Sequence, residues 1–364
     1  MTRTSVAFSA RRTPPLALAL LAVLAVLSAA CGGDTIGNTP AATRATTAGT
    51  PTPVATIPVG LVPMPTPTTE AEAAAEAGSS EPAAELTAID PTALQAEVDA
   101  LVAGLGGLVA VEVEEPGGTS LASWNAGEQM EAASLYKLAI MVETFRQRDA
   151  GMLTFDDPVL LQDYHFSEGG DVFSEEEIGT TADVATLLEA MITVSSNVAA
   201  TALLEYVGTD NVNETMASLG LSSTQIRWYP GPSGDADEPA AGRRLLVARP
   251  DIRADEALNV TSAGDVAALF RMLLAGEVVN AEASQEMLDL LGRQEINDRL
   301  PALLPGGTVV AHKTGNLDGL MHDAGVIYAP AGPVIVVVMT EDLDEVDSTF
   351  LIAQVGLLAY EAHQ

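Results

Sequence analysis

The stretch Ser134-Leu135-Tyr136-Lys137 opens a run of helical pattern that continues to about Leu274. At the start of a helix, residues three positions apart share a face, so the ammonium nitrogen of Lys137 can reach the hydroxyl oxygen of Ser134. The N-terminal end of the helix adds a positive partial charge beside that oxygen. A serine attacks an acyl group when a neighbouring base takes its proton, so this stretch predicts a nucleophile and its activating partner.

The scarcity of lysine makes this pair more specific. Only two of the 16 Lys and Arg residues are lysines, Lys137 and Lys313. Arginine keeps its proton in proteins, so a position that must supply a base requires lysine. The retention of lysine at these two positions alone indicates that both have a chemical role.

Strand-like segments flank the helical run on both sides, and amphipathic helices are expected near Pro91 and from Phe350 to Leu358. Within the helical run, one helix is expected over Thr181–Thr193 with Thr181 as its N-cap. The order helix, two strands, helical block, three strands, helix predicts an α/β sheet domain interrupted by an all-helical domain, with a cleft where they meet. Five segments have a strand pattern: 108–114, 121–124, 308–313, 324–328 and 334–340.

Two further motifs follow the serine–lysine pair along the chain. Ser195-Ser196-Asn197 stands at the start of a predicted helix, and Lys313-Thr314-Gly315 stands at the end of a predicted strand. The patterns S-x-x-K, S-x-N and K-T-G in this order resemble the signature of class A β-lactamases and related penicillin-binding proteins. The gap of 61 residues between Ser134 and Ser195 is also similar to class A.

This resemblance covers about residues 91–364. It implies an antiparallel five-stranded sheet domain flanked by helices, with an inserted all-helical subdomain at about 134–274. It also implies a serine hydrolase that works through an acyl-enzyme and needs no cofactor.

The resemblance assigns roles to individual residues. Ser134 resembles the nucleophile, Lys137 the group that deprotonates it, and Ser195 the serine that passes a proton to the leaving nitrogen. The backbone N–H of Ser134 would form part of the oxyanion hole. Asn197 resembles the amide that binds the substrate side chain and orients Lys137. Without the flanking motifs, Ser195 and Asn197 would be interpreted as a helix cap without a chemical role.

The segment Lys313-Thr314-Gly315 resembles the one that binds the substrate carboxylate. The resemblance also implies that Lys313 and Thr314 adjust the reactivity of Ser195. Many class A enzymes hold that carboxylate with an arginine on the following strand, whereas this chain has His322 and Asp323 there. We expect His322 either to take over the carboxylate contact or to be a buried structural histidine.

A larger departure lies in the segment that resembles the class A omega loop. Class A enzymes typically have R-W-E-P there, with Glu as the base for deacylation, whereas this chain has Arg227-Trp228-Tyr229-Pro230. Tyr229 therefore stands where the base is expected. The acidic residues Asp235 and Glu238 follow in a long loop and are alternative candidates.

The N-terminal part has the pattern of an export signal. Residues 1–31 combine arginines with an apolar run too short for a membrane span, which predicts a signal peptide. Cys31 follows small residues in a setting similar to a bacterial lipobox, so lipidation at Cys31 is expected, with ordinary signal cleavage as the alternative. Residues 32–89 are rich in Thr, Pro and Ala, which predicts a disordered tether. The catalytic domain would then span 90–364, outside the cytoplasm and anchored to the cell membrane.

Charge and composition restrict the partners. The net charge of −34 would repel nucleic acid phosphates and anionic lipid heads. We therefore expect no nucleic-acid partner and membrane contact only through the lipid anchor. The residues His165, His312 and His363 lack metal-ligand spacing, so no metal site is predicted.

Three functions remain open at this stage. The first is a β-lactamase-like serine hydrolase that is acylated by β-lactams and deacylates slowly because of Tyr229. The second is a penicillin-binding D,D-carboxypeptidase or an esterase that acts on a peptidoglycan-like acyl substrate. The third is a degenerate lipoprotein that binds ligands without turnover, which the intact Ser134 and Lys137 argue against.

Overall fold

The computed structural model describes residues 91–167, 171–230, 243–245 and 259–364. The predicted signal peptide with Cys31 and the predicted tether lie outside these residues and stay predictions. In the described ranges no helix has both the length and the apolar character that a membrane crossing requires.

A five-stranded antiparallel sheet forms the centre of the fold, with the strand order β2-β1-β11-β10-β9. The strands are β1 (Leu108–Glu114), β2 (Ser120–Trp124), β9 (Val310–Leu317), β10 (Leu320–Ala329) and β11 (Gly332–Glu341). The central strand β11 is rich in Val and Ile and buried along most of its length, as expected for a strand covered on both faces. The predicted α/β fold with an antiparallel five-stranded sheet is confirmed.

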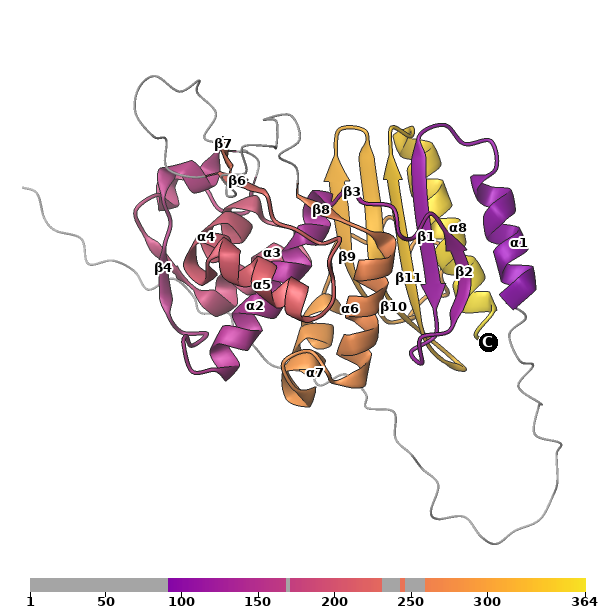
Figure 1. The fold of residues 1–364 in the computed structure, drawn as a ribbon. Coiled ribbons are helices and arrows are strands. Elements are labelled where there is room, and N and C mark those ends of the chain that lie inside the picture. Colours follow the sequence, from indigo (N-terminus) through magenta and orange to yellow (C-terminus); the bar gives the residue numbers. More distant parts are fainter. Residues whose placement is uncertain (1–90, 168–170, 231–242, 246–258) are drawn as a thin grey trace, which may run out of the picture. The chain divides into compact units, whose positions relative to one another are not determined.

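Helices cover both faces of this sheet. The alternating side chains Val109, Val111 and Val113 of β1 join one apolar core with residues of α1 (Pro91–Val102) and α8 (Glu345–Glu361). Ala110, on the opposite face of β1, joins a second core that continues into the helical region. Figure 1 shows the helical region beyond the edge strand β9, which is therefore the strand of the sheet nearest to this region.

The helical region contains α2, α3, α4 and α5, while α6 packs against both β1 and β11. The short elements are β3 (Met130–Glu131), η1 (Ala133–Tyr136), β4 (Pro158–Leu160), η2 (Asp163–Phe166), η3 (Glu175–Glu177), β5 (Thr181–Asp183), β6 (Trp228–Pro230), β7 (Arg243–Leu245) and β8 (Val260–Thr261). The bounds of the remaining helices are α2 Lys137–Asp149, α3 Val184–Thr193, α4 Asn197–Val207, α5 Thr209–Ser218, α6 Ala263–Ala275 and α7 Ala281–Leu291.

The start of α3 differs from the prediction. Thr181 does not cap this helix, because it lies in the short strand β5 (Thr181–Asp183) and pairs with Leu160 of β4 (Pro158–Leu160). The N-cap is Asp183, whose side chain accepts a hydrogen bond from the backbone N–H of Thr186 at 2.7 Å. Threonine and aspartate are both good N-caps, and the residue nearer to the helix takes the position.

Close packing between β9 and β10 leads to a prediction at Gly325. A Cβ atom at this position would lie 2.5 Å from Cβ of His312 and closer still to the carbonyl oxygen of Ala311. We expect Gly325→Ala to lower the free energy of unfolding by about 1–3 kcal/mol, because the strands must move apart to accept a methyl group. Urea unfolding measures this loss.

Gly306→Ala is the matched control, since no atom lies within 4 Å of a Cβ atom built at Gly306. Equal stabilities of the two alanine variants would contradict the packing argument.

Candidate active site

Ser134 lies in a short 3₁₀ helix, η1 (Ala133–Tyr136), which leads directly into α2. Its side chain is half-buried, whereas its neighbours Ala133 and Leu135 are buried. Ala133 has a φ of 41°, a left-handed conformation that is unfavourable for a residue with a Cβ atom. A Cβ atom at Gly315 would lie 3.2 Å from Cβ of Ala133. Strand β9 therefore lies directly against the segment that carries Ser134.

Lys137 is fully buried and reaches the Ser195-Ser196-Asn197 turn. Its Nζ donates to the carbonyl oxygen of Ser195 at 2.6 Å, to Oδ1 of Asn197 at 2.6 Å and to Oγ of Ser195 at 3.2 Å. Ser195 and Asn197 lie about 60 residues after Lys137 in the sequence. The fold therefore brings together the first two motifs that the sequence analysis identified.

Ser195 has an unfavourable backbone conformation, with a φ of 62°. Such a conformation costs about 1–3 kcal/mol for a residue other than glycine and persists only where the surroundings fix it. It places the Ser195 hydroxyl between the two lysines of the chain, 3.2 Å from Nζ of Lys137 and 2.9 Å from Nζ of Lys313. One hydroxyl oxygen thus accepts from two ammonium groups.

Lys313 is fully buried on β9 and also donates to the carbonyl oxygen of Thr314 at 2.8 Å. Burial lowers the pKa of Lys313 well below its usual value, and the nearby positive charges of Lys137 and Arg299 lower it further. The carboxylate of Asp323 acts in the opposite direction and raises this pKa. The site therefore makes the proton of Lys313 easier to remove.

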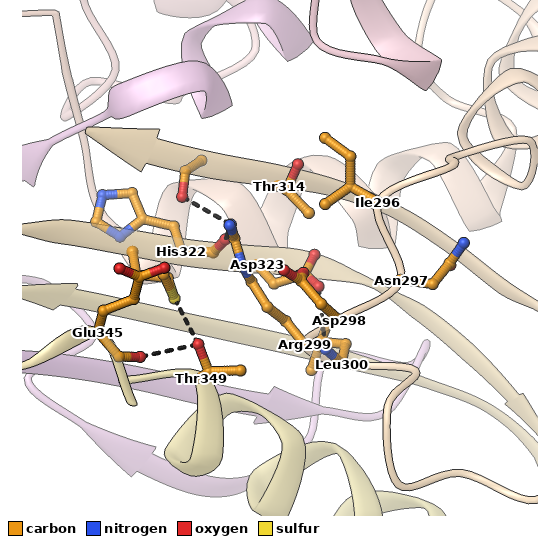
Figure 2. A network of polar contacts seen from close by, with 12 residues as sticks. Ile296, Asn297, Asp298, Arg299, Leu300, Thr314, His322, Asp323, Glu345 and Thr349 are labelled. Carbon is orange, nitrogen blue, oxygen red and sulfur yellow. Dashed lines mark hydrogen bonds and ion pairs between the residues drawn. The ribbon is translucent and has the colours of Figure 1, made fainter. Parts of the chain in front are cut away.

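A buried polar network supports the strand that carries Lys313. Nδ1 of His312 lies 2.8 Å from Oδ1 of Asp323, and both side chains are fully buried. Arg299 donates through Nη1 to the carbonyl oxygen of Gly315 at 2.9 Å and to that of His322 at 3.0 Å. Figure 2 shows the Arg299 side chain extending from its loop toward the strands that carry Thr314 and His322. The guanidinium thus ties β9 to β10 next to the K-T-G segment.

Comparisons with known proteins identify relatives of this chain. Residues 93–363 match the model of the beta-lactamase enzyme family. The chain belongs to this family. It is similar to the extended-spectrum beta-lactamase PER-1 of Pseudomonas aeruginosa, with 26% identity over 290 residues, which cover 74% of this chain and 86% of that protein.

Solved structures show the same relation. A beta-lactamase from Sphaerobacter thermophilus is 28% identical, with a TM-score of 0.63 over 76% of this chain and 98% of that chain. An ancestral class A beta-lactamase is 26% identical, with a TM-score of 0.60 over 74% of this chain and 99% of that chain. The protein is therefore a serine hydrolase of the class A β-lactamase-like kind.

His322 does not have the surroundings that a substrate contact requires. Its ring is fully buried, Nε2 lies 2.9 Å from the carbonyl oxygen of Glu131, and Nδ1 accepts from the backbone N–H of Thr340 at 3.2 Å. Burial lowers its pKa, which favours the neutral ring. With both nitrogens engaged, the ring offers nothing to a substrate carboxylate. The structural interpretation of His322 replaces the predicted carboxylate contact.

Arg299 provides a positive charge that the sequence analysis missed. The resemblance to class A enzymes predicts such an arginine on the strand after Lys313-Thr314-Gly315, whereas Arg299 lies in the loop before β9. Its side chain is 5% exposed, and Nε lies 3.4 Å from Oδ1 of Asp298. A loop without periodicity gave no signal that this arginine would be buried against the K-T-G segment.

Asp171 is a second residue that the sequence analysis missed. Its carboxylate accepts hydrogen bonds from the Ser196 hydroxyl and from the backbone N–H of Asn197, both at 2.7 Å. It therefore holds the turn that contacts Lys137.

Tyr229 lies in β6 (Trp228–Pro230), where it pairs with Arg244 of β7 (Arg243–Leu245). The position of its side chain lies outside what the structure describes, as do Asp235 and Glu238. Arg227, two residues before Tyr229, donates its backbone N–H to Oδ1 of Asn259 at 2.8 Å. The replacement of the omega-loop glutamate by Tyr229 therefore stays a prediction.

The two lysines allow a direct test of the pKa of Lys313. Carbon-13 labelling of lysine side chains gives two signals, which a Lys137→Arg variant assigns. We expect the Lys313 signal to titrate below the ordinary lysine pKa of about 10.4, because burial and neighbouring cations disfavour its charged form.

Only the protonated ammonium attracts a carboxylate, so affinity for an anionic ligand should fall as the pH rises through this lowered pKa. A Lys313 midpoint at or above the ordinary value would contradict the electrostatic argument.

Proposed function

We propose that this protein forms an acyl-enzyme with β-lactams at Ser134 and hydrolyses it slowly. The observation that carries the proposal is the convergence of Lys137, Asn197 and Lys313 on the turn at Ser195, beside the segment that carries Ser134. Membership of the beta-lactamase enzyme family supports the same chemistry.

In the proposed acylation, Lys137 takes part as the uncharged amine, because an ammonium group has no lone pair to accept a proton. The oxygen of Ser134 attacks the carbonyl carbon of the β-lactam ring and its proton passes to the nitrogen of Lys137. The carbon–nitrogen bond then breaks, and the leaving nitrogen takes a proton through the hydroxyl of Ser195. The 2.9–3.2 Å contacts of Ser195 with both lysines suit it to this transfer. The backbone N–H of Ser134, at the N-terminal end of a helix, would stabilise the oxyanion.

Binding of the substrate carboxylate is proposed for the K-T-G segment. Lys313 and Thr314 would supply a charge and a hydroxyl, and Arg299 beneath Gly315 adds positive potential. Because His322 has no free nitrogen, the carboxylate would be held without it.

Deacylation is the step that the sequence leaves without its usual base. An ordinary phenol has a pKa near 10 and is protonated at neutral pH, so Tyr229 would not activate water as a glutamate does. General-base assistance is typically worth about 10²- to 10⁴-fold, or about 2.7–5.5 kcal/mol of barrier. The acyl-enzyme should therefore accumulate.

Covalent labelling tests the nucleophile. We expect a fluorescent penicillin to label the wild-type protein with one equivalent and Ser134→Ala not at all, because the alanine variant lacks the attacking oxygen. Peptide mapping by mass spectrometry should find the label on Ser134, and circular dichroism checks that the variant is folded. Labelling of a folded Ser134→Ala variant would refute the assignment.

Pre-steady-state kinetics test the role of Tyr229. We expect a stoichiometric burst of penicillin hydrolysis followed by slow turnover in the wild type. Tyr229→Glu should accelerate the slow phase about 10- to 100-fold and leave the burst rate unchanged, because a carboxylate restores a base for water without altering acylation. Tyr229→Phe is the matched control and should keep the slow phase. Rapid wild-type turnover without a burst would exclude slow deacylation and favour a base such as Asp235 or Glu238.

A penicillin-binding D,D-carboxypeptidase or esterase is the second candidate. Tyr229 favours it, because a site without the usual base for deacylation is a poor penicillin hydrolase. Release of the C-terminal residue from a D,D-dipeptide substrate, faster than hydrolysis of penicillin, would identify this activity.

A further inference from the structure

Asp171 contacts the Ser195-Ser196-Asn197 turn through both carboxylate oxygens. Oδ1 accepts from the Ser196 hydroxyl at 2.7 Å and from the backbone N–H of Phe173 at 3.2 Å. Oδ2 accepts from the backbone N–H groups of Asn197 at 2.7 Å and Val198 at 3.1 Å. Three of these four donors belong to the turn and the first residues of α4, which lie 25 or more residues further along the chain.

These bonds complete the N-terminal cap of α4. Ser196 is the N-cap, and its hydroxyl oxygen accepts from the backbone N–H of Ala199 at 3.0 Å. Asp171 takes the N–H groups of Asn197 and Val198, which have no partner within the helix. A carboxylate at this end of a helix also interacts favourably with the helix dipole. The first turn of α4 is thus held by a charge from a different segment.

The capped turn carries Ser195 and Asn197, which both contact Lys137. Ser195 keeps its left-handed conformation, and Asn197 keeps its side chain 2.6 Å from Nζ of Lys137. Loss of the carboxylate would leave the strain at Ser195 without this support. Displacements of about 1 Å at catalytic groups can cost about 10²-fold in rate.

The motif itself offers a reason for this arrangement. The class A signature is S-D-N, with an aspartate at its middle position, whereas this chain has Ser196 there. An aspartate at that position would itself be the N-cap of α4. Here the N-cap is a serine, and a carboxylate reaches the same helix end from Asp171.

We propose that Asp171 is a positioning residue that supplies, from a separate segment, the carboxylate that the S-D-N motif carries in its middle. It acts through Ser195 and Asn197 and does not touch the substrate. The proposal rests on the function proposed above for these residues.

Acylation kinetics give the first test, with an aspartate of purely structural role as the control. We expect Asp171→Asn to lower the acylation rate constant for a fluorescent penicillin about 10- to 100-fold and to change its initial binding little. Asp183→Asn removes the charge of the N-cap of α3, away from the Ser195 turn, and should acylate within twofold of the wild type. Rates are compared below the melting temperature of each variant. Equal rates for the two variants would overturn the proposal.

A rescue variant separates a positioning carboxylate from general damage. Ser196→Asp placed in the Asp171→Asn background returns a carboxylate to the N-cap and should restore the rate to within about fivefold of the wild type. Failure to restore any activity in a folded double variant would count against the proposal.

The two-lysine NMR spectrum tests the inference without a substrate. Asp171→Asn should shift the carbon-13 signal of Lys137, whose partners Ser195 and Asn197 move, and Asp183→Asn should not. An unchanged Lys137 signal in Asp171→Asn refutes the positioning role. If the wild-type protein is not acylated by penicillin, the proposed function fails, while this spectrum still decides the role of Asp171.

Discussion

Two buried ammonium groups share one hydroxyl oxygen, and the rest of the site is arranged to allow this. Removing a charged group from water is costly, and placing two like charges beside each other adds to that cost. The fold offsets the cost around Lys137 with a carbonyl oxygen, the amide oxygen of Asn197 and the hydroxyl of Ser195. Around Lys313 it uses the same hydroxyl and the carbonyl oxygen of Thr314. The strained backbone of Ser195 is part of this solution, since it brings two acceptors of one residue to Lys137.

The surroundings of the K-T-G strand follow from the same constraint. Asp323 supplies a buried negative charge near Lys313, and His312 holds that carboxylate at 2.8 Å. Arg299 adds a further cation, which satisfies the carbonyl oxygens of Gly315 and His322. The carboxylate of Asp298 lies 3.4 Å from Nε of Arg299, so a second acidic side chain stands beside these cations.

Sequence patterns predicted those parts of the molecule that periodicity and motif spacing specify. The strands have alternating or continuous apolar side chains, and Lys137 and Lys313 are conspicuous because other lysines are absent. Asp171 and Arg299 were missed because both lie in irregular segments, which have no periodic pattern. Their contacts with the start of α4 and with β9 depend on the tertiary structure. His322 was ambiguous for a related reason, since a histidine on a strand gives no indication of what its ring nitrogens contact. The cap of α3 was placed two residues early because Thr181 and Asp183 are both residue types that cap helices.

The pairing of β1 with β11 has a consequence for the order of events during synthesis. Leu108 near the start of the described chain pairs with Glu341 near its end, and the whole helical region lies between them. The sheet therefore cannot close until its last strand has been made, and such distant contacts form slowly because a long loop must first be closed. Strand β9 borders Ser134 and depends on β10 and β11 for its position in the sheet. The nascent chain thus has no complete active site until β11 has been synthesised.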